Sequence, residues 1–346
     1  MGASLHFRGP AKYRLLSMAE FGESVTEVWV RRMAKGPRRP GWNWFMELAT
    51  ELLKRRMSTV REMTDVQEAR RYLDSLEIRL PELDEVDITQ VTNERFRGSW
   101  FTPRKAEGGA TVLYFHGGGY SFYPKAYASF IALVALAAKS RTFALDYSLA
   151  PEQRFPVQVR EALDAYRWLL ENSGDGHSIV VAGDSAGGNL ALALLQTLRD
   201  LRLPMPMLAI ALSPPTDFEM DRAVAVRKAD GDWIEMGMLE RWADWFCDPE
   251  KRRDPLVSPL QADLHGLPPI YLQAGGAELL YDSIRAFADR ARREGAEVVL
   301  ESWADMNHDF QMFGRYVPQS AEALRRVGEM IETRKREVQS AKAVFR

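Results

Sequence analysis

From residue 86 onward the sequence alternates short β-rich runs with longer helical stretches, and this rhythm constrains the fold more than any other feature. Several of the runs are continuously apolar, as in strands that are covered on both faces. The alternation predicts an α/β fold with a mostly parallel central sheet flanked by helices. The predicted strands are Thr111–Phe115, Thr142–Asp146, Ile179–Ala182, Leu208–Leu212, Ile270–Gln273 and Val298–Glu301, and the predicted helices lie near 125–139, 157–171, 187–200, 280–294 and 319–335.

Residues 1–85 follow a different pattern. Lys12–Met33 and Trp42–Met57 carry apolar residues at three-to-four spacing, which predicts helices. We therefore predict two units, an N-terminal helical region over 1–85 and a second domain over 86–346. The first 45 residues hold eight Lys/Arg and three Asp/Glu. This bias fits either a helix packed on the body with a solvated basic face or a segment that contacts a membrane surface.

A stretch at 213–260 interrupts the rhythm of strands and helices. It contains the aromatic-rich helical run Trp233–Phe246 and ends in a charged, proline-containing segment. Its Trp and Met side chains favour an insertion that covers the strand ends, although the same side chains equally serve to anchor a surface helix to the body. We predict a cap insertion at this point of the domain.

Composition excludes several classes of protein. The net charge is −2 and the sequence pI is about 6.3, which argues against a nucleic-acid partner. The single cysteine, Cys247, permits neither an internal disulfide nor a cysteine-based zinc site. The longest apolar run, Phe130–Ala138, is too short for the ~20 residues of a membrane span. The N-terminus has no apolar core of signal-peptide type, so we expect a cytoplasmic location.

The motif Gly183-Asp184-Ser185-Ala186-Gly187 lies between a predicted buried strand and a predicted helix. This is the context of a nucleophile elbow, a turn so sharp that glycine is needed on both sides of the serine. The helix N-terminus also favours negative charge that develops next to it. We predict that Ser185 is a nucleophile.

The strand Thr111–Phe115 is followed by His116-Gly117-Gly118-Gly119-Tyr120. Glycines leave backbone N–H groups uncovered, and such donors stabilise a tetrahedral oxyanion. A glycine-rich turn alone is usually only a turn. Together with the elbow about 70 residues later, in this order, it indicates an oxyanion loop.

A nucleophilic serine needs a base, and the chain has five histidines. His6 lies in the N-terminal arm, and His116 belongs to the glycine loop. His177 precedes the elbow strand, and His265 precedes another strand. Only His308 lies late in the chain and beyond the carboxyl end of a strand, as the order Ser…acid…His requires.

Five segments carry a resemblance to a known family. The sequence is similar to the bacterial hormone-sensitive-lipase-like esterases of the α/β-hydrolase fold over roughly residues 86–335. The matching segments are HGGGY at 116–120, DYSLAPE at 146–152, FPVQVREALDAYRWL at 155–169, GDSAGGNLA at 183–191 and MNHDF at 306–310. The resemblance implies carboxylic-ester hydrolysis and a helical cap built from the N-terminal region and the insertion.

The resemblance also assigns roles to individual residues. It places the oxyanion donors at the backbone amides of Gly118, Gly119 and Ala186, and it gives Asp184 and Glu152 structural hydrogen bonds. It implies no metal or organic cofactor. It allows a homodimer, which no residue of this sequence decides.

The acid of the triad departs from the family pattern. After the strand Ile270–Gln273, such enzymes usually carry Gly-x-Asp, but this chain places Ala277 at the acid position. Glu278 is one residue later and one methylene longer, and Ser-His-Glu triads occur on this fold. Asp282 follows about one helical turn further on. We predict Glu278 as the acid and keep Asp282, or a weakened triad, as the alternatives.

The sequence thus predicts a serine carboxylesterase that acts on small-molecule esters of short to medium chain. Ser185, His308 and Glu278 form its triad, and the reaction passes through an acyl-enzyme. One alternative is a binding protein on the same fold, since plant gibberellin receptors resemble the family but lack the working histidine. An amidase or a lactonase with the same nucleophile is the nearer alternative.

Overall fold

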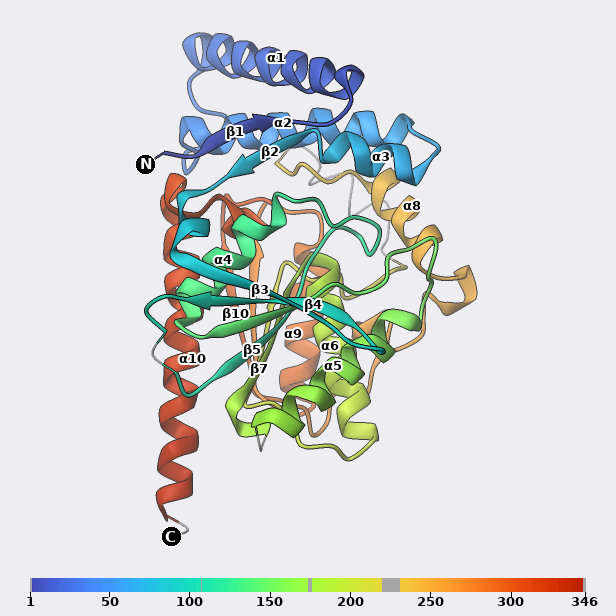
Figure 1. Cartoon of the computed structure of the whole chain (residues 1–346), viewed down its shortest axis with the longest axis vertical. Coiled ribbons are helices and arrows are strands. Elements are labelled where there is room, and N and C mark those ends of the chain that lie inside the picture. The colour runs from blue at the N-terminus through green and yellow to red at the C-terminus, as the bar shows by residue number, and fades with distance from the viewer. Residues whose placement is uncertain (1, 107, 174–175, 220–230, 345–346) are drawn as a thin grey trace.

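The central sheet has eight strands in the order β10-β9-β8-β7-β5-β6-β4-β3 (Figure 1). The computed structural model describes residues 2–106, 108–173, 176–219 and 231–344. The strands from β10 to β6 run parallel, whereas β4 pairs antiparallel with both β6 and β3. The strands of this sheet are β3 (Val86–Thr92), β4 (Arg97–Pro103), β5 (Thr111–Phe115), β6 (Arg141–Leu145), β7 (Ile179–Asp184), β8 (Leu208–Leu212), β9 (Ile270–Gly275) and β10 (Val298–Trp303).

Helices cover both faces of this sheet. Along β5, Val112 and Tyr114 pack toward α4 and α10, while Leu113 and Phe115 pack toward α5 and α6. Successive side chains of a strand point to opposite faces, so a continuously apolar run is buried on both sides. The helices are α1 (Ala11–Lys35), α2 (Trp44–Glu62), α3 (Val66–Leu73), α4 (Tyr127–Ala138), α5 (Val157–Ser173), α6 (Ser185–Asp200), α8 (Met236–Phe246), α9 (Tyr281–Arg293) and α10 (Pro318–Val344).

The predicted α/β class and the six predicted strands are confirmed, and each strand begins within one residue of its expected start. Four strands escaped the sequence analysis. Two of them, β3 and β4, extend the sheet by antiparallel pairing. Most of β3 is exposed and β4 is only partly buried, so neither forms a continuous apolar run. The expectation that residues 1–85 are helical is wrong at two places. There β1 (Ser4–Phe7) pairs antiparallel with β2 (Leu76–Arg79), a contact across about 70 residues that no local pattern reveals.

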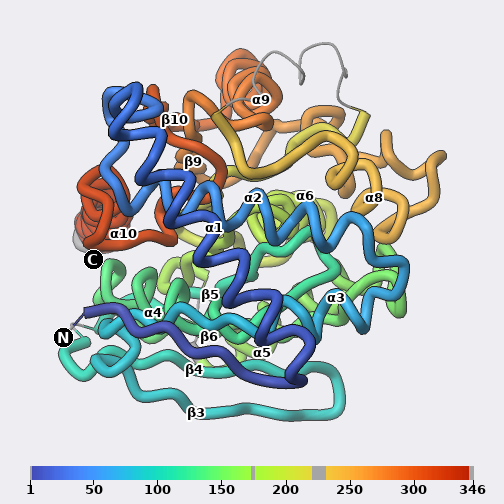
Figure 2. Tube along the Cα trace, turned by 90° about the horizontal axis from the view of Figure 1, so that it is seen from above, coloured from blue at the N-terminus to red at the C-terminus, as the bar shows by residue number. Residues whose placement is uncertain are grey.

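The N-terminal helices lie over one end of the sheet, with α1 outermost and α2 beneath it (Figures 1 and 2). Arg31 and Arg32 of α1 both bind the buried carboxylate of Glu47 on α2. These basic side chains therefore hold α1 on the body. Across the described residues, no helix combines the length and the hydropathy needed to cross a bilayer.

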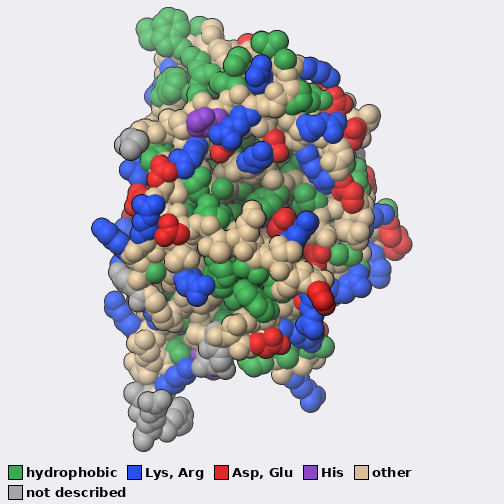
Figure 3. All heavy atoms as spheres, viewed as in Figure 1, with side chains coloured by type: hydrophobic (Ala, Val, Ile, Leu, Met, Phe, Trp, Pro, Cys, Tyr) green, Lys and Arg blue, Asp and Glu red, His purple; other side chains and the backbone are tan. Residues whose placement is uncertain are grey.

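The outer face of α1 carries several large apolar side chains. Its side chains are exposed to solvent at Leu15, Met18, Trp29, Val30 and Met33. Figure 3 shows hydrophobic side chains gathered along this end of the molecule. Lys12, Arg14 and Lys35 of α1 are exposed, whereas Arg31 and Arg32 turn inward to pair with Glu47 of α2. The helix packs on the body as expected, and its outer face carries apolar as well as basic side chains.

The insertion at 213–260 lies partly outside the described residues, since 220–230 are not among them. Its aromatic residues pack on the body. Trp233 and Trp242 are buried in a cluster with side chains of α2 and α3, and Trp242 contacts Phe122 edge to face at 6.3 Å. These contacts anchor α8 beside the N-terminal helices.

Candidate active site

Ser185 lies on the turn between β7 and α6, and its φ of 48° is in the left-handed region. A Cβ on Gly183 would lie 2.4 Å from the backbone of Gly187, and a Cβ on Gly187 would lie 2.0 Å from the carbonyl oxygen of Phe115. Both approaches are closer than any side chain permits. The two glycines therefore allow the turn that presents the serine hydroxyl at the carboxyl end of the sheet.

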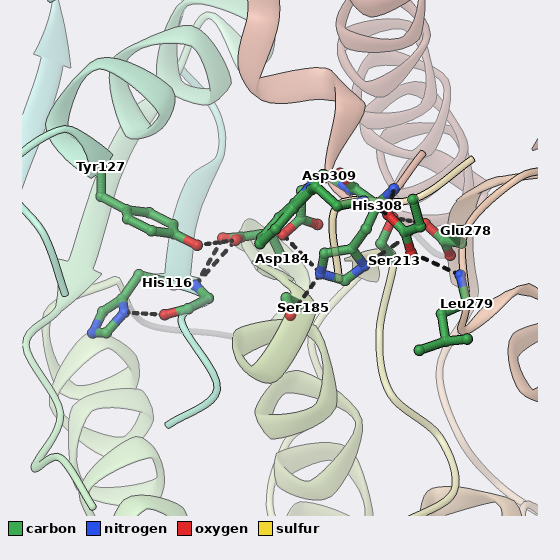
Figure 4. A network of polar contacts seen from close by, with 12 residues as sticks. His116, Tyr127, Asp184, Ser185, Ser213, Glu278, Leu279, His308 and Asp309 are labelled. Atoms are coloured by element: carbon green, nitrogen blue, oxygen red, sulfur yellow. Dashed lines mark hydrogen bonds and ion pairs between the residues drawn. The ribbon is translucent and has the colours of Figure 1, made fainter. Parts of the chain in front are cut away.

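His308 lies directly beside this serine (Figure 4). Its Nε2 is 2.9 Å from Oγ of Ser185, and the imidazole is fully buried. The residue follows β10, and its carbonyl oxygen accepts a hydrogen bond of 2.8 Å from the indole of Trp233. The tertiary structure thus brings together two residues that are 123 positions apart in the chain.

Glu278 approaches the other ring nitrogen of His308. Its Oε2 lies 3.8 Å from Nδ1 and accepts a hydrogen bond of 2.6 Å from Oγ of Ser213. This distance is that of an ion pair without a direct hydrogen bond. Asp282 lies instead in the first turn of α9, where its partly exposed carboxylate pairs with Arg285 at 3.8 Å. Ala277 is nearly buried and offers no carboxylate.

The glycine loop lies against the same turn. Gly118 and Gly119 have φ values of 99° and 59°. A Cβ on Gly118 would lie 2.1 Å from the carbonyl oxygen of Phe122, and a Cβ on Gly119 would lie 2.4 Å from the ring of Trp242. The third predicted donor, Ala186, is in the first turn of α6, where backbone N–H groups have no partner within the helix.

The first residue of the loop holds it in place. The ring of His116 is stacked between Tyr123 and Tyr147 at centroid distances of 3.7 and 4.1 Å. Burial lowers the pKa of His116 to about 3, so this ring is neutral. Asp184 accepts hydrogen bonds from the Gly117 amide, at 3.1 Å to each oxygen, and from the hydroxyl of Tyr114 at 2.5 Å. These contacts fix the loop beside the elbow.

Two cavities meet at Ser185. One has a volume of about 200 Å³ and an apolar lining that includes Leu52, Met57 and Phe313. The other has a volume of about 330 Å³, and its lining includes charged side chains such as Glu240 and Arg252. Gly119 and Trp242 line both cavities, so the glycine loop and α8 lie where the two spaces join.

Comparisons with known proteins agree with this geometry. A family model of the α/β-hydrolase fold matches residues 112–312. An acetyl-hydrolase of Streptomyces hygroscopicus is 35% identical over 256 residues, which cover 73% of this chain and 84% of that protein. A crystal structure of an esterase from the bacterial hormone-sensitive lipase family superimposes with a TM-score of 0.71 at 30% identity, covering 92% of this chain and 98% of that one. The chain belongs to this family of carboxylic ester hydrolases.

Two further relatives align with this esterase over nearly their whole length. An esterase of Acinetobacter venetianus is 30% identical over 295 residues, or 84% of this chain and 96% of that protein. The crystal structure of the esterase EstE5 soaked with p-nitrophenyl butyrate has a TM-score of 0.75 at 30% identity, covering 82% of this chain and 98% of that one. The family named from the sequence motifs is therefore confirmed.

Sequence reasoning missed two buried residues that hold the site of the esterase together. Asp232 accepts hydrogen bonds from the backbone amides of His308 at 3.1 Å and Leu279 at 2.8 Å, and so ties the histidine loop to the glutamate loop. Ser213 donates to Glu278. Ser213 follows β8 directly, and the rule that ligands lie beyond the carboxyl ends of parallel strands would have identified it. No local signal marks Asp232, which lies in the insertion.

The buried charges around His308 shift the pKa values of His308 and Glu278. Burial alone lowers the pKa of His308, but the carboxylates of Asp309, Glu278 and Asp232 outweigh burial and raise that pKa to about 9. Burial raises the pKa of Glu278 to about 8, and the positive charge of His308 opposes this shift. The carboxylate of Glu278 and the imidazolium of His308, both fully buried, therefore stabilise each other.

Proposed function

We propose that this esterase hydrolyses short- to medium-chain carboxylic esters through an acyl-enzyme on Ser185. The observation that carries the proposal is the distance of 2.9 Å between Oγ of Ser185 and Nε2 of the buried His308. His308 takes the hydroxyl proton while Oγ attacks the ester carbonyl. The tetrahedral intermediate then collapses, His308 gives the proton to the leaving alcohol, and the acyl group stays on Ser185.

Water completes the cycle by the same steps. His308 takes a proton from water, the hydroxide attacks the acyl-enzyme, and the carboxylic acid leaves as the proton returns to Ser185. We assign the oxyanion donors to the amides of Gly118, Gly119 and Ala186. Glu278 is assigned to orient and stabilise His308, which the ion-pair distance of 3.8 Å supports.

A burst assay tests this mechanism. A short p-nitrophenyl ester should release one equivalent of p-nitrophenol per active site before the steady state. An organophosphate should abolish the burst and add its mass to the peptide that contains Ser185. Label on another residue, with full activity, would overturn the proposal. A protein that binds the ester without turnover would favour the binding-protein alternative, and preference for amides or lactones would favour the other hydrolases.

We further propose that residues 1–85 and the insertion at 213–260 form a cap over the nucleophile. The lining of the apolar cavity supports this proposal, because it combines Ser185 with α2 residues such as Leu52 and with Trp242 of α8. A homodimer and a cytoplasmic location stay predictions. Light scattering after size-exclusion chromatography tests the first, and cell fractionation tests the second.

A capped site of limited volume should prefer short acyl chains. We expect kcat/KM for p-nitrophenyl acetate or butyrate to exceed that for p-nitrophenyl palmitate by at least about tenfold, because a cavity of about 200 Å³ holds few methylene groups. A relative from Pseudomonas putida is named ethyl acetate hydrolase. Interfacial activation on emulsified long-chain triglyceride would contradict the expectation.

The pH dependence follows from the role of His308. Only the neutral imidazole accepts the serine proton, so kcat/KM should fall as the pH drops below the pKa of His308. The surrounding carboxylates raise that pKa to about 9, so the acid limb should lie above the pH of 6.5 typical of an unperturbed histidine. A pH profile on p-nitrophenyl acetate checks this result. Activity that stays flat down to about pH 4 would exclude His308 as the base.

A further inference from the structure

A second carboxylate lies against the reactive nitrogen of His308. Asp309 is 1% exposed, and its Oδ2 is 3.1 Å from Nε2 of His308. This is the same nitrogen that lies 2.9 Å from Oγ of Ser185. In Figure 4 the Asp309 carboxylate lies between Asp184 and the imidazole. Nε2 therefore has two neighbours, of which the proposed mechanism uses only the serine.

The carboxylate of Asp309 has little else to compensate its burial. Among the described residues, neither of its oxygens has a hydrogen-bond donor, and the backbone amide of Asp309 donates to Oγ of Ser213 at 3.3 Å. A buried carboxylate is costly unless it is paired. A proton on Nε2 would place a positive charge 3.1 Å from Oδ2 and so supply the pair. Asp309 thus stabilises the protonated form of the base.

Further acids face His308 from neighbouring elements. Glu278 approaches Nδ1 from the loop after β9, and Asp232 binds the His308 amide from the segment before α8. Burial and the negative charge of Asp309 raise the pKa of Asp184, at the end of β7, to about 8, and the positive charge of His308 opposes this shift. The hydroxyl of Tyr127 donates to Asp184 at 3.1 Å. Of these acids, Asp309 comes closest to the nitrogen that must be free of a proton when Ser185 is activated.

We propose that Asp309 is a positioning residue that competes with Ser185 for Nε2 of His308 and thereby sets the pH at which the esterase becomes active. The inference rests on the proposed roles of Ser185 and His308. At low pH the imidazolium is held by Asp309, and the serine has no base. As the pH rises, Nε2 loses its proton, the attraction to Asp309 ends, and Ser185 donates to Nε2 instead. An opposite charge at this distance typically displaces a histidine titration by about one to three pH units.

The test is a pair of substitutions followed over pH. Asp309→Asn keeps the shape of the side chain and removes its charge. We expect the acid limb of kcat/KM for p-nitrophenyl acetate to move down by at least about one pH unit. At a pH on the wild-type acid limb, the variant should keep about tenfold more of its own plateau activity than the wild type keeps. Asp282→Asn also removes one carboxylate, from the surface of α9, and should leave the limb in place.

Two further measurements keep the proposal falsifiable. Asp309 has a φ of 51°, which glycine adopts without strain, so Asp309→Gly replaces the Asn variant if that protein does not fold. NMR titration of the His308 ring in the full chain reports its protonation without relying on turnover, and the wild-type midpoint should lie at least about one unit above that of the variant. An unchanged midpoint and acid limb would overturn the role of Asp309. Loss of the serine mechanism would appear separately, as a failure of the burst assay in the wild type.

Discussion

Replacing Ser185 with alanine should lower kcat/KM for p-nitrophenyl acetate by about 10⁴-fold or more, while the protein folds normally. The proposed mechanism has one nucleophile, and the alanine variant can use only binding energy and the oxyanion donors. The hydroxyl contributes little to the fold, because its contact is with His308 rather than with the core. The circular dichroism spectrum and the melting temperature should therefore match the wild type.

A matched control separates the loss of the nucleophile from general damage. Ser302→Ala removes a hydroxyl on β10 that accepts a hydrogen bond from Tyr281, and we expect it to change kcat/KM less than twofold. If Ser185→Ala kept most of its activity, the elbow serine would not be the nucleophile. The mechanism would then fail, even though the chain belongs to an esterase family.

The second large effect concerns the triad acid. Glu278→Gln should lower kcat by about 10³- to 10⁴-fold, because the amide neither stabilises the imidazolium nor enforces one tautomer of His308. Asp282→Asn should cost less than about threefold, since its partly exposed carboxylate pairs with Arg285 on the same helix. Steady-state kinetics of both variants on one substrate provide the comparison.

Other results for the Glu278→Gln and Asp282→Asn variants would assign the triad acid differently. A large effect of Asp282 with a small effect of Glu278 would make Asp282 the acid and Glu278 a carboxylate at the start of the helix. If neither variant lost activity, Ser185 and His308 would act as a dyad. In that case Ala277→Asp should raise turnover, because it places a carboxylate at the position where related enzymes carry one. The substitution requires a small adjustment, since Ala277 packs closely against Gly231.

Local chemistry was enough to predict the main residues of the candidate site. The glycines around Ser185 are needed because the turn leaves no space for a Cβ, and this requirement is visible in five consecutive residues. The strands β5 and β8 were predicted residue for residue, because a run buried on both faces is apolar at nearly every position. His308 could be chosen from five histidines by its place after the last strand.

Contacts between distant segments could not be predicted in this way. The ribbon of β1 and β2 joins two short strands that lie about 70 residues apart in the chain. The edge strand β3 pairs with the neighbouring β4, but most of its residues are exposed, so it carries no apolar run that would predict a strand. Asp232 lies in an insertion without a motif, and its role appears only when two loops meet at its carboxylate. Asp309 stood inside a segment used to recognise the family, yet its closeness to Nε2 depends on a left-handed backbone turn.

The sequence by itself predicted the α/β class and the order of the parallel strands along the chain, because the apolar runs alternate with helical stretches from residue 86 onward. It also pointed to the proposed serine and histidine, because each stands in a short recognisable segment. Only the tertiary structure decided which carboxylates surround His308. Glu278 and Asp232 reach His308 from separate loops. Asp309 follows His308 directly, and its carboxylate approaches Nε2 in a left-handed backbone conformation that the sequence does not specify. Electrostatic interactions in a buried site depend on distances of a few ångströms, and such distances are set by how the loops pack at the end of the sheet.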